Sequence, residues 1–278
     1  MTLRINSNDS MEAYQQLRAS SKELSSSLER LSSGKRINRA ADDASGMMIA
    51  DSLGSQRRGI GQSIRNATDA IAMAQVADGA LGESVSLLQN IRAKALQAAG
   101  DSQSQASRQA LQADIDKSLA SLNDIAANTS YNGQKLLSGM FTDKSFQVGA
   151  YSGETIDMNI SSASAAELGG ENGVLSGINV LSQEGAQAAI AVIDNALAEV
   201  DQLRGDIGST QNQLESSVAN LSITEINIAA AESGIADLDY AEESTNLAQM
   251  KVLDQARIFA QAQSGKINKE GIINLLQG

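Results

Sequence analysis

Residues 50–95 read ADSLGSQRRGIGQSIRNATDAIAMAQVADGALGESVSLLQNIRAKA, and this stretch decides the fold. Its apolar residues recur at alternating spacings of three and four, which is the period of a helix that packs along one seam against other helices. Eleven of the fourteen positions in the pattern are apolar, and the exceptions are Arg57, Asp78 and Arg92. These three charges either reach solvent from the edge of the bundle, or they fix the helix register or contacts between neighbouring molecules.

Other parts of the chain repeat the pattern. Stripes of the same spacing run over residues 14–31, 111–125, 193–238 and 247–260. The pair Ser33-Gly34 is typical of a helix end, and we expect Asp101 or Ser102 to cap the helix that carries the second of these stripes. The turn sequence Tyr131-Asn132-Gly133 ends that helix, and residues 237–239 break the last two stripes apart.

Only residues 140–182 depart from helical periodicity. Two short runs there, 146–150 and 156–160, alternate apolar and polar residues around the turn 151–154, which predicts a β-hairpin. The following stretch, 161–177, is rich in Ser, Ala and Gly and is typical of a surface loop.

Helix length predicts the shape. A single helix over residues 41–99 would be about 88 Å long, whereas a compact globule of 278 residues has a diameter of roughly 50 Å. We therefore expect a mainly α protein: an elongated, coiled-coil-like helical bundle forming a rod, with a small β-hairpin region and paired N- and C-terminal helices.

Composition excludes several functions. The chain has no His, Cys, Pro or Trp and a net charge of −12. Without His or Cys there is neither a Ser-His-Asp or Cys-His nucleophile system nor an ordinary zinc site, and the negative charge argues against a nucleic-acid partner. We expect no enzyme activity and no cofactor or metal. The start, MTLRINSNDS, has no apolar core of a cleaved signal peptide, so any export is expected to use another route.

The terminal segments are expected to act in association. Each carries its own apolar stripe, and a breaker separates each from the central helices. Lone amphipathic helices of this size are marginal in water. The two segments either fold back onto the rod or complete their core with copies from neighbouring molecules, which would make them an association site.

Specific residues resemble a known family. The run LERLSSGKRINRAADDASGMMIADSL at residues 28–53 resembles the N-terminal signature of bacterial flagellins, and ADLDYAEESTNLAQMKVLDQARIFAQAQ at 236–263 resembles their C-terminal one. Further similarity lies in the turn at 131–133 with Leu136-Leu137 and in the hairpin sequence FQVGAYSGETIDMNI. Two departures are Lys35, where the family usually has an aliphatic residue, and the missing proline near the C-terminus.

The resemblance implies a self-assembling filament subunit with three parts. Residues 1–33 and 240–278 would form the inner-tube domain, 34–43 a spoke loop, and 44–239 the rod domain with its hairpin region 140–182. It also implies export through the flagellar type III apparatus to an extracellular flagellum, hook-junction and cap proteins as partners, and a cytoplasmic export chaperone. Because larger flagellins insert variable domains after the hairpin, this chain is similar to a minimal form.

The resemblance also implies which residues form contacts between subunits. These are the apolar residues of the terminal stripes and the charges of the spoke loop: Leu17, Leu24, Leu28, Leu31, Arg36, Arg39, Asp42, Asp43, Leu247, Met250, Leu253, Ile272, Leu275 and Leu276. From the residues alone, the spoke charges with Lys35 could instead form an anion site or a solvated loop with local ion pairs. Asp42 and Asp43 also suit the first turn of the long helix.

A second surface is implied by the innate-immune role of the family. Many flagellins are recognised by a Toll-like receptor through the counterpart of residues 88–97, and Gln89, Arg92 and Gln97 match the recognised pattern. Asn90 replaces an arginine, Lys94 replaces an aliphatic residue, and Asp114 replaces a glutamate on the neighbouring helix. Loss of a planar, multi-donor guanidinium removes a strong interface anchor, so we expect weak recognition.

Two other functions remain open at this stage. A hook–filament junction protein of the same export system shares both terminal signatures, and a secreted, non-polymerising coiled-coil adhesin would share the helical pattern.

Overall fold

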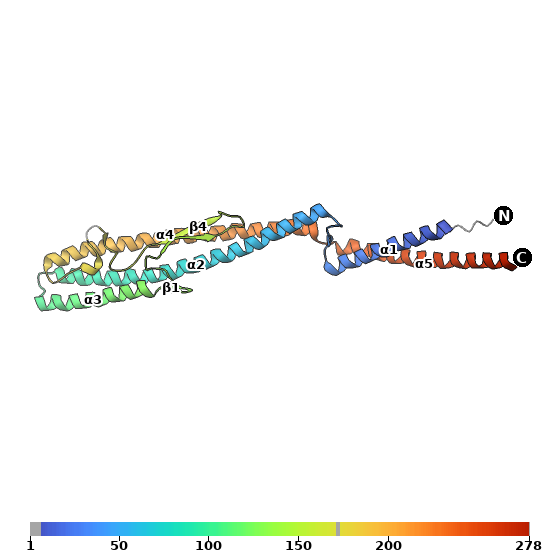
Figure 1. The fold of residues 1–278 in the computed structure, drawn as a ribbon. Coiled ribbons are helices and arrows are strands. Elements are labelled where there is room, and N and C mark those ends of the chain that lie inside the picture. Colours follow the sequence, from blue (N-terminus) through green and yellow to red (C-terminus); the bar gives the residue numbers. More distant parts are fainter. Residues whose placement is uncertain (1–6, 171–172, 278) are drawn as a thin grey trace. The chain divides into compact units, whose positions relative to one another are not determined.

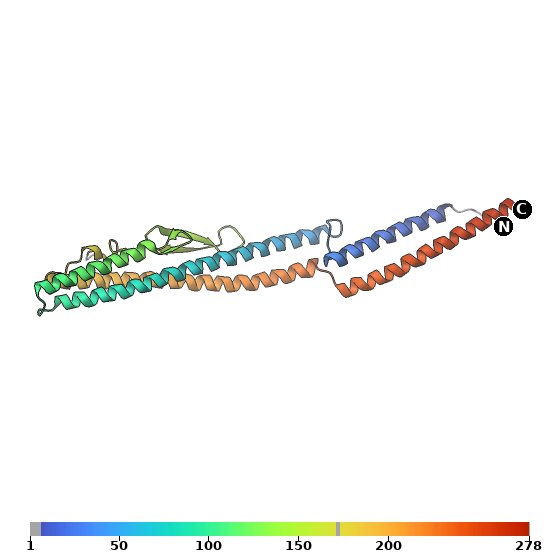
Figure 2. The ribbon, with the colours of Figure 1, turned by 90° about the horizontal axis from the view of Figure 1, so that it is seen from below.

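The computed structural model describes residues 7–170 and 173–277, which are drawn as ribbons in Figures 1 and 2. The chain divides into two compact units, one made of residues 1–55 and 227–278 and the other of residues 56–226. We call them the terminal unit and the central unit. The prediction of a mainly α protein with a small hairpin region and paired terminal helices is confirmed.

Three long helices supply the core of the central unit. They are α2 (Ala44–Ala99), α3 (Gln105–Asn128) and α4 (Gln183–Ala236), and within this unit they lie side by side (Figures 1 and 2). Buried residues of all three join one hydrophobic cluster. Ser104 caps α3 by accepting a hydrogen bond from the Ser107 N–H, so the prediction of Asp101 or Ser102 is wrong. Residues 100–104 connect α2 to α3, so α3 begins later than predicted.

The seam of α2 consists of two rows, of which the sequence predicted one. The predicted row that the structure confirms recurs at every seventh residue, and all of its members are buried: Ile60, Ala67, Ala74, Leu81, Leu88 and Ala95. The second buried row is made mainly of small residues: Ser63, Ala70, Ala77, Ser84, Ile91 and Ala98. The predicted second row of Ile64, Ile71, Asp78, Val85 and Arg92 flanks the seam and is only half-buried. Small side chains let helix backbones approach closely, so packing favours them over the larger residues that a hydrophobic pattern selects.

Two of the charges that interrupt the predicted seam pair with α4. Asp78 Oδ1 lies 2.8 Å from Arg204 Nε, and Arg92 Nε lies 2.6 Å from Asp194 Oδ1. Each hydrogen-bonded carboxylate raises the pKa of its arginine. Since all four side chains are partly exposed, solvent screens both pairs and their contribution to stability is small. The charges therefore lie at the edge of the bundle, and Arg57 is half-buried.

The apolar stripe of α4 is confirmed most clearly in its first half, where Ile193, Val200 and Ile207 are buried as predicted. Beyond Leu214 the predicted stripe is less deeply buried: Ile228 is buried, Leu221 and Ile235 are half-buried, and Thr224 and Ala231 are exposed.

Two short hairpins follow α3. The strands β1 (Ser130–Tyr131) and β2 (Gln134–Lys135) are antiparallel. Asn132 and Gly133 connect them with φ values of 46° and 79°, which is the left-handed pair that a two-residue hairpin turn needs. The turn predicted from Tyr131-Asn132-Gly133 is confirmed.

The second hairpin pairs β3 (Phe141–Gln147) with β4 (Thr155–Ile160), with Phe146 opposite Ile156. The hairpin is confirmed, but its first strand was predicted too late, because Val148 and Ala150 lie beyond its end. The Val148 N–H still donates to the Glu154 carbonyl at 2.9 Å, and the Gly149 carbonyl then accepts a hydrogen bond from the Ser63 hydroxyl at 2.8 Å, which binds this segment to α2.

The stretch predicted as a surface loop, residues 161–177, is partly buried over its described residues, 161–170 and 173–177, so that prediction is wrong. Ala163, Ala165, Leu168 and Leu175 are buried, the last in the short 3₁₀ helix η2 (Leu175–Gly177). These apolar residues have no regular spacing, so periodicity could not identify them.

The terminal unit pairs α1 (Ser7–Ser33) with α5 (Tyr240–Gln277), which contact each other and run antiparallel (Figures 1 and 2). α1 ends as predicted: Gly34 has a φ of 71°, and its N–H donates to the Arg30 carbonyl at 2.8 Å. The break at residues 237–239 is also confirmed. α5 is one continuous helix that extends beyond both ends of the apolar stripe at residues 247–260.

Candidate assembly surface

The apolar stripe of α1 is divided between two faces. Leu17, Leu24 and Leu31 are half-buried, and Ser20 and Ser27 between them are buried. Because α1 contacts α5, this face is the one that pairs the two helices. Three large apolar residues lie off it and are exposed: Met11, Tyr14 and Leu28, at 64%, 46% and 46%.

The apolar residues of α5 are divided in the same way. Leu247 and Met250 are half-buried. Val252, Leu253, Ile258 and Phe259 are between 51% and 74% exposed. A shallow hollow in this surface is lined by Ala248, Gln249, Val252 and Leu253. Of the predicted contact residues, Ile272, Leu275 and Leu276 have side chains that lie outside the described part of the chain.

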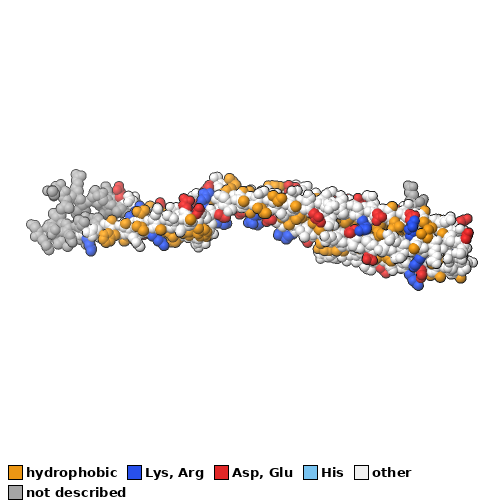
Figure 3. Space-filling view, turned by 180° about the vertical axis from the view of Figure 1, so that it is seen from behind, with side chains coloured by type: hydrophobic (Ala, Val, Ile, Leu, Met, Phe, Trp, Pro, Cys, Tyr) orange, Lys and Arg blue, Asp and Glu red, His pale blue; other side chains and the backbone are white. Residues whose placement is uncertain are grey.

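This exposed surface is costly for an isolated chain. Full burial of a Leu or Phe side chain contributes about 1.5–3 kcal/mol, and Figure 3 shows exposed hydrophobic side chains along the α1–α5 pair. Contiguous apolar surface of this kind normally marks a site of association. We call the residues Met11, Tyr14, Leu28, Val252, Leu253, Ile258 and Phe259 the bare apolar face.

The connector between α1 and α2, residues 34–43, is tied to the junction between α4 and α5. The Arg36 N–H donates to the Ala236 carbonyl at 2.8 Å, and the Leu238 N–H donates to the Gly34 carbonyl at 3.0 Å. Arg36 Nη2 donates to the Ile235 carbonyl at 2.7 Å. A Cβ on Gly34 would lie 2.9 Å from the Tyr240 hydroxyl oxygen. Hydrogen bonds therefore join the connector between α1 and α2 directly to the segment between α4 and α5.

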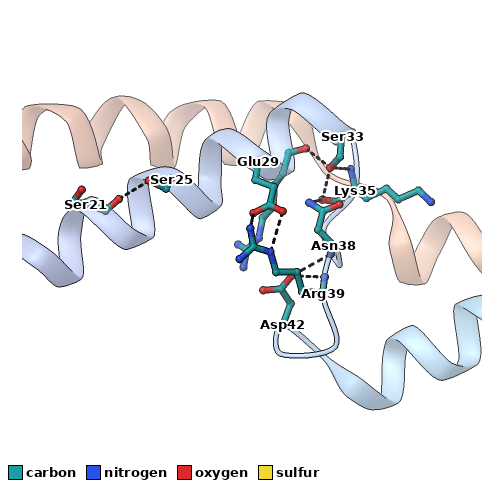
Figure 4. Close-up of polar contacts among 9 residues, drawn as sticks. Ser21, Ser25, Glu29, Ser33, Lys35, Asn38, Arg39 and Asp42 are labelled. Carbon is teal, nitrogen blue, oxygen red and sulfur yellow. Dashed lines mark hydrogen bonds and ion pairs between the residues drawn. The ribbon is translucent and has the colours of Figure 1, made fainter.

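The two aspartates of the connector accept backbone hydrogen bonds. Asp42 Oδ2 accepts the N–H groups of Asn38 and Arg39 at 3.1 and 2.9 Å (Figure 4). These two bonds lower the pKa of Asp42. Asp43 Oδ1 accepts the Gly46 N–H at 2.9 Å, and this bond, with one from the Ser45 hydroxyl, lowers the pKa of Asp43. Asp43 thus caps α2 from the residue before it. The prediction that Asp42 and Asp43 lie in the first turn of the long helix is wrong, because α2 begins at Ala44 and its first turn holds no acidic residue.

Arg39 pairs with Glu29, a partner that the sequence did not identify. Arg39 Nε lies 3.0 Å from Glu29 Oε1, and Nη2 bonds the other carboxylate oxygen (Figure 4). The spacing of ten residues matches no helical contact, because the chain turns at Gly34. Since Arg36 and Arg39 both donate to acceptors of the chain itself, the connector has local pairs and capping bonds in place of an anion site.

The residues of the expected receptor region lie in the central unit. Gln89, Asn90 and Gln97 are exposed on α2. Lys94 Nζ lies 3.8 Å from Asp114 Oδ2 on α3, whereas Arg92 pairs with α4. The exposed residues of this region therefore share α2 with two charged side chains: Lys94 pairs with α3, and Arg92 pairs with α4.

Two other kinds of site were sought in the described residues. Within residues 7–170 and 173–277, no group of three or more Asp or Glu side chains is placed to hold a metal ion. No helix in this part of the chain is long and apolar enough to span a membrane.

Comparison with known proteins gives consistent results for both ends of the chain. The family model of the bacterial flagellin N-terminal helical region matches residues 5–142, and that of the C-terminal helical region matches residues 190–276. Flagellin A of Vibrio cholerae serotype O1 is 33% identical over 380 residues, which cover all of this chain and all of that protein. Flagellin B of Helicobacter pylori is 53% identical over 169 residues, or 60% of this chain. The match spans only 33% of the length of that relative.

Solved structures agree in fold. A Bacillus cereus flagellin superposes with a TM-score of 0.50 at 25% identity, covering 60% of this chain and 94% of that one. A structure described as a flagellar hook-associated protein from Vibrio parahaemolyticus gives a TM-score of 0.59, covering 70% and 100% of the two chains, but its 18% identity supports the fold alone. Two family models and a relative aligned along its full length thus agree, and the chain belongs to the bacterial flagellin family.

Proposed function

We propose that this chain is the structural subunit of a bacterial flagellar filament and that it polymerises with copies of itself through α1 and α5. One observation carries the proposal: the bare apolar face exposes large hydrophobic residues on both terminal helices of a flagellin. Neighbouring copies would bury this face, and the gain in apolar burial would drive assembly.

The proposed organisation has three parts. The paired terminal helices, residues 1–33 and 240–278, would form the inner tube, the connector 34–43 the spoke, and residues 44–239 the outer rod. The hydrogen bonds between the connector and residues 235–238 support this division, because they hold the start of the rod beside the start of α5. The chain is a short flagellin in which residues 161–182 join β4 to α4 without a large variable domain.

Several partners would follow from a role in the filament. We infer that hook-junction and cap proteins contact the two ends of the polymer and that an export chaperone covers the bare part of α5 before secretion. The exposed Val252, Leu253 and Phe259 support the chaperone, since an unassembled chain would otherwise carry them bare in the cytoplasm. The assembled filament would be extracellular, after export through the flagellar type III apparatus.

Weak recognition by a Toll-like receptor is a further part of the proposal. Asn90 is exposed and offers no guanidinium, and Lys94 is paired with Asp114 where a recognised flagellin presents an aliphatic side chain. A receptor would have to break this pair and desolvate the ammonium group, which costs free energy.

A hook–filament junction protein or a secreted coiled-coil adhesin is less well supported. The flagellins of two Vibrio species are 32–33% identical and align along 94–100% of this chain. The likeness to a hook-associated structure is one of fold.

Electron microscopy of the purified chain after addition of salt or filament seeds tests the proposal. We expect regular tubes that grow from seeds. A chain that stays monomeric at every concentration and seed density would support one of the other two functions. Removal of residues 1–33 or 240–278 should abolish tubes but leave the central unit folded.

A further inference from the structure

The face that pairs α1 with α5 contains polar groups that have not found partners. Ser27 is 1% exposed and Glu243 is 7% exposed. Within the described residues, Ser27 Oγ, Arg30 Nε and Glu243 Oε1 are buried and make no hydrogen bond. A buried polar atom without a partner costs about 1–3 kcal/mol, so this cluster is an unfavourable feature of the single chain.

Two of these atoms belong to one ion pair that is not fully closed. Arg30 Nη1 lies 4.0 Å from Glu243 Oε2. This is the outer limit of an ion pair and beyond hydrogen-bond distance, since a charge-assisted N–H···O bond is about 2.8 Å long. The unused donor Nε lies on the other edge of the guanidinium from Nη1, beside Nη2, and the unused acceptor Oε1 belongs to the same carboxylate as Oε2.

A closed pair of the same chemistry lies in the same unit. Arg39 and Glu29 form a two-bond fork, with Nε 3.0 Å from Oε1. If Arg30 and Glu243 formed the same fork, Arg30 Nε and Glu243 Oε1 would both gain partners. The change needed is a turn of the Arg30 guanidinium that brings Nε and Nη2 to face Glu243 and shortens the 4.0 Å separation to hydrogen-bond distance.

We propose that Arg30 and Glu243 form an assembly latch, which is open in the single chain and closes into a two-bond fork when neighbouring copies pack on the bare apolar face. In the single chain α1 and α5 contact each other through one face, and their other faces are exposed. Neighbouring copies would pack on those faces and exclude water, which strengthens a buried ion pair. Arg30 and Glu243 are thus positioning residues that set the register of α1 on α5 in the polymer.

The latch gives assembly a requirement beyond hydrophobic contact. Apolar surfaces tolerate sliding, whereas a planar guanidinium bonded to both oxygens of a carboxylate accepts one geometry. The closed fork would therefore select one α1–α5 register out of those that the apolar residues allow. This inference rests on the proposed polymerisation.

A double-mutant cycle with Arg30→Gln, Glu243→Gln and the combined variant tests the latch. The critical concentration for polymerisation and the unfolding equilibrium of dilute monomer are measured for each chain. We expect the two substitutions to be coupled by about tenfold in critical concentration and by less than about twofold in monomer unfolding. Arg30→Lys keeps the charge but cannot form the fork, so it should also raise the critical concentration severalfold.

The pair Asp78–Arg204 is the matched control, since it joins two helices and is already closed at 2.8 Å. The cycle with Asp78→Asn and Arg204→Gln should show equal coupling in the monomer and in the polymer. Equal coupling for Arg30 and Glu243 in both states would show that their pair is already formed. No coupling in either state would show that the pair is unused, and both results overturn the latch. Failure of the unmodified chain to polymerise would instead contradict the proposed function.

Discussion

Replacement of single leucines by aspartate separates residues that hold the chain folded from residues that hold copies together. Leu214 of α4 is fully buried, whereas Leu253 of α5 is 53% exposed. The same change of side chain therefore meets two different environments in one molecule. We expect Leu214→Asp to destabilise the monomer and Leu253→Asp to block polymerisation.

The magnitudes follow from burial. Removing a buried leucine side chain costs about 2–5 kcal/mol, and the unpaired carboxylate adds to this. A loss of 3–5 kcal/mol lowers the melting temperature of a unit of this size by about 10 °C. For Leu253→Asp the exposed carboxylate stays hydrated in the monomer, so the change there should stay within about 0.5 kcal/mol.

For polymerisation we expect a large free-energy cost from Leu253→Asp, which has little effect on the monomer. Leu253→Asp would lose about 1 kcal/mol of further apolar burial and would bury a carboxylate at a cost of about 2 kcal/mol or more. A total of about 3 kcal/mol raises the critical concentration more than about hundredfold. Leu28, which is 46% exposed, should respond in the same way.

The assay combines thermal unfolding of dilute monomer, followed by circular dichroism, with sedimentation of polymer at increasing protein concentration. Leu181→Asp is the matched control, since Leu181 is 41% exposed and lies in the central unit; it should change neither quantity. Equal losses of melting temperature for Leu214→Asp and Leu253→Asp would refute the reasoning, because they would show that Leu253 is already packed in the monomer. The substitution Leu247→Asp is less informative, since Leu247 is half-buried against the rest of the terminal unit.

Three further results are expected. Ala74→Leu should destabilise the monomer by about 1–3 kcal/mol in chemical unfolding, because Ala74 is fully buried in the seam of α2 and a larger side chain would force the helices apart. The stabilising effect of Asp42 should be present above about pH 3.9 and disappear as the pH falls through its lowered folded-state pKa; backbone hydrogen exchange at Asn38 and Arg39 should accelerate over that range, and Asp42→Asn should remove the pH dependence. The double substitution Asn90→Arg with Lys94→Leu should raise Toll-like receptor signalling about tenfold or more in reporter cells given equal monomer concentrations, whereas strong signalling by the unmodified chain would contradict the weight placed on Asn90.

The sequence alone determined the long helices and the two breaks that separate the terminal helices from the central ones. An alternation of three and four over residues 50–95 requires a long helix with one buried side, and Gly34 and residues 237–239 interrupt the pattern where the helices stop. The Asn132-Gly133 pair likewise determined its own turn, because few residues adopt two successive positive φ values. These features depend on the backbone preferences of adjacent residues, which a sequence states directly.

Tertiary structure decided which side of each helix is buried. Ala70, Ala77 and Ala98 form half of the second buried row of α2, although a hydrophobic pattern gives them less weight than Ile64 and Ile71. An alanine in a helix contact and an alanine on an exposed side of the helix look the same in the sequence. Only the packing of a second helix distinguishes them.

The same is true of the charged contacts. Glu29 meets Arg39 because the chain reverses at Gly34, and Arg30 meets Glu243 because α5 returns beside α1. The sequence placed Arg39 in the connector but could name neither partner. An ion pair depends on distances between side chains of separate segments, and the fold sets those distances only after the helices have packed.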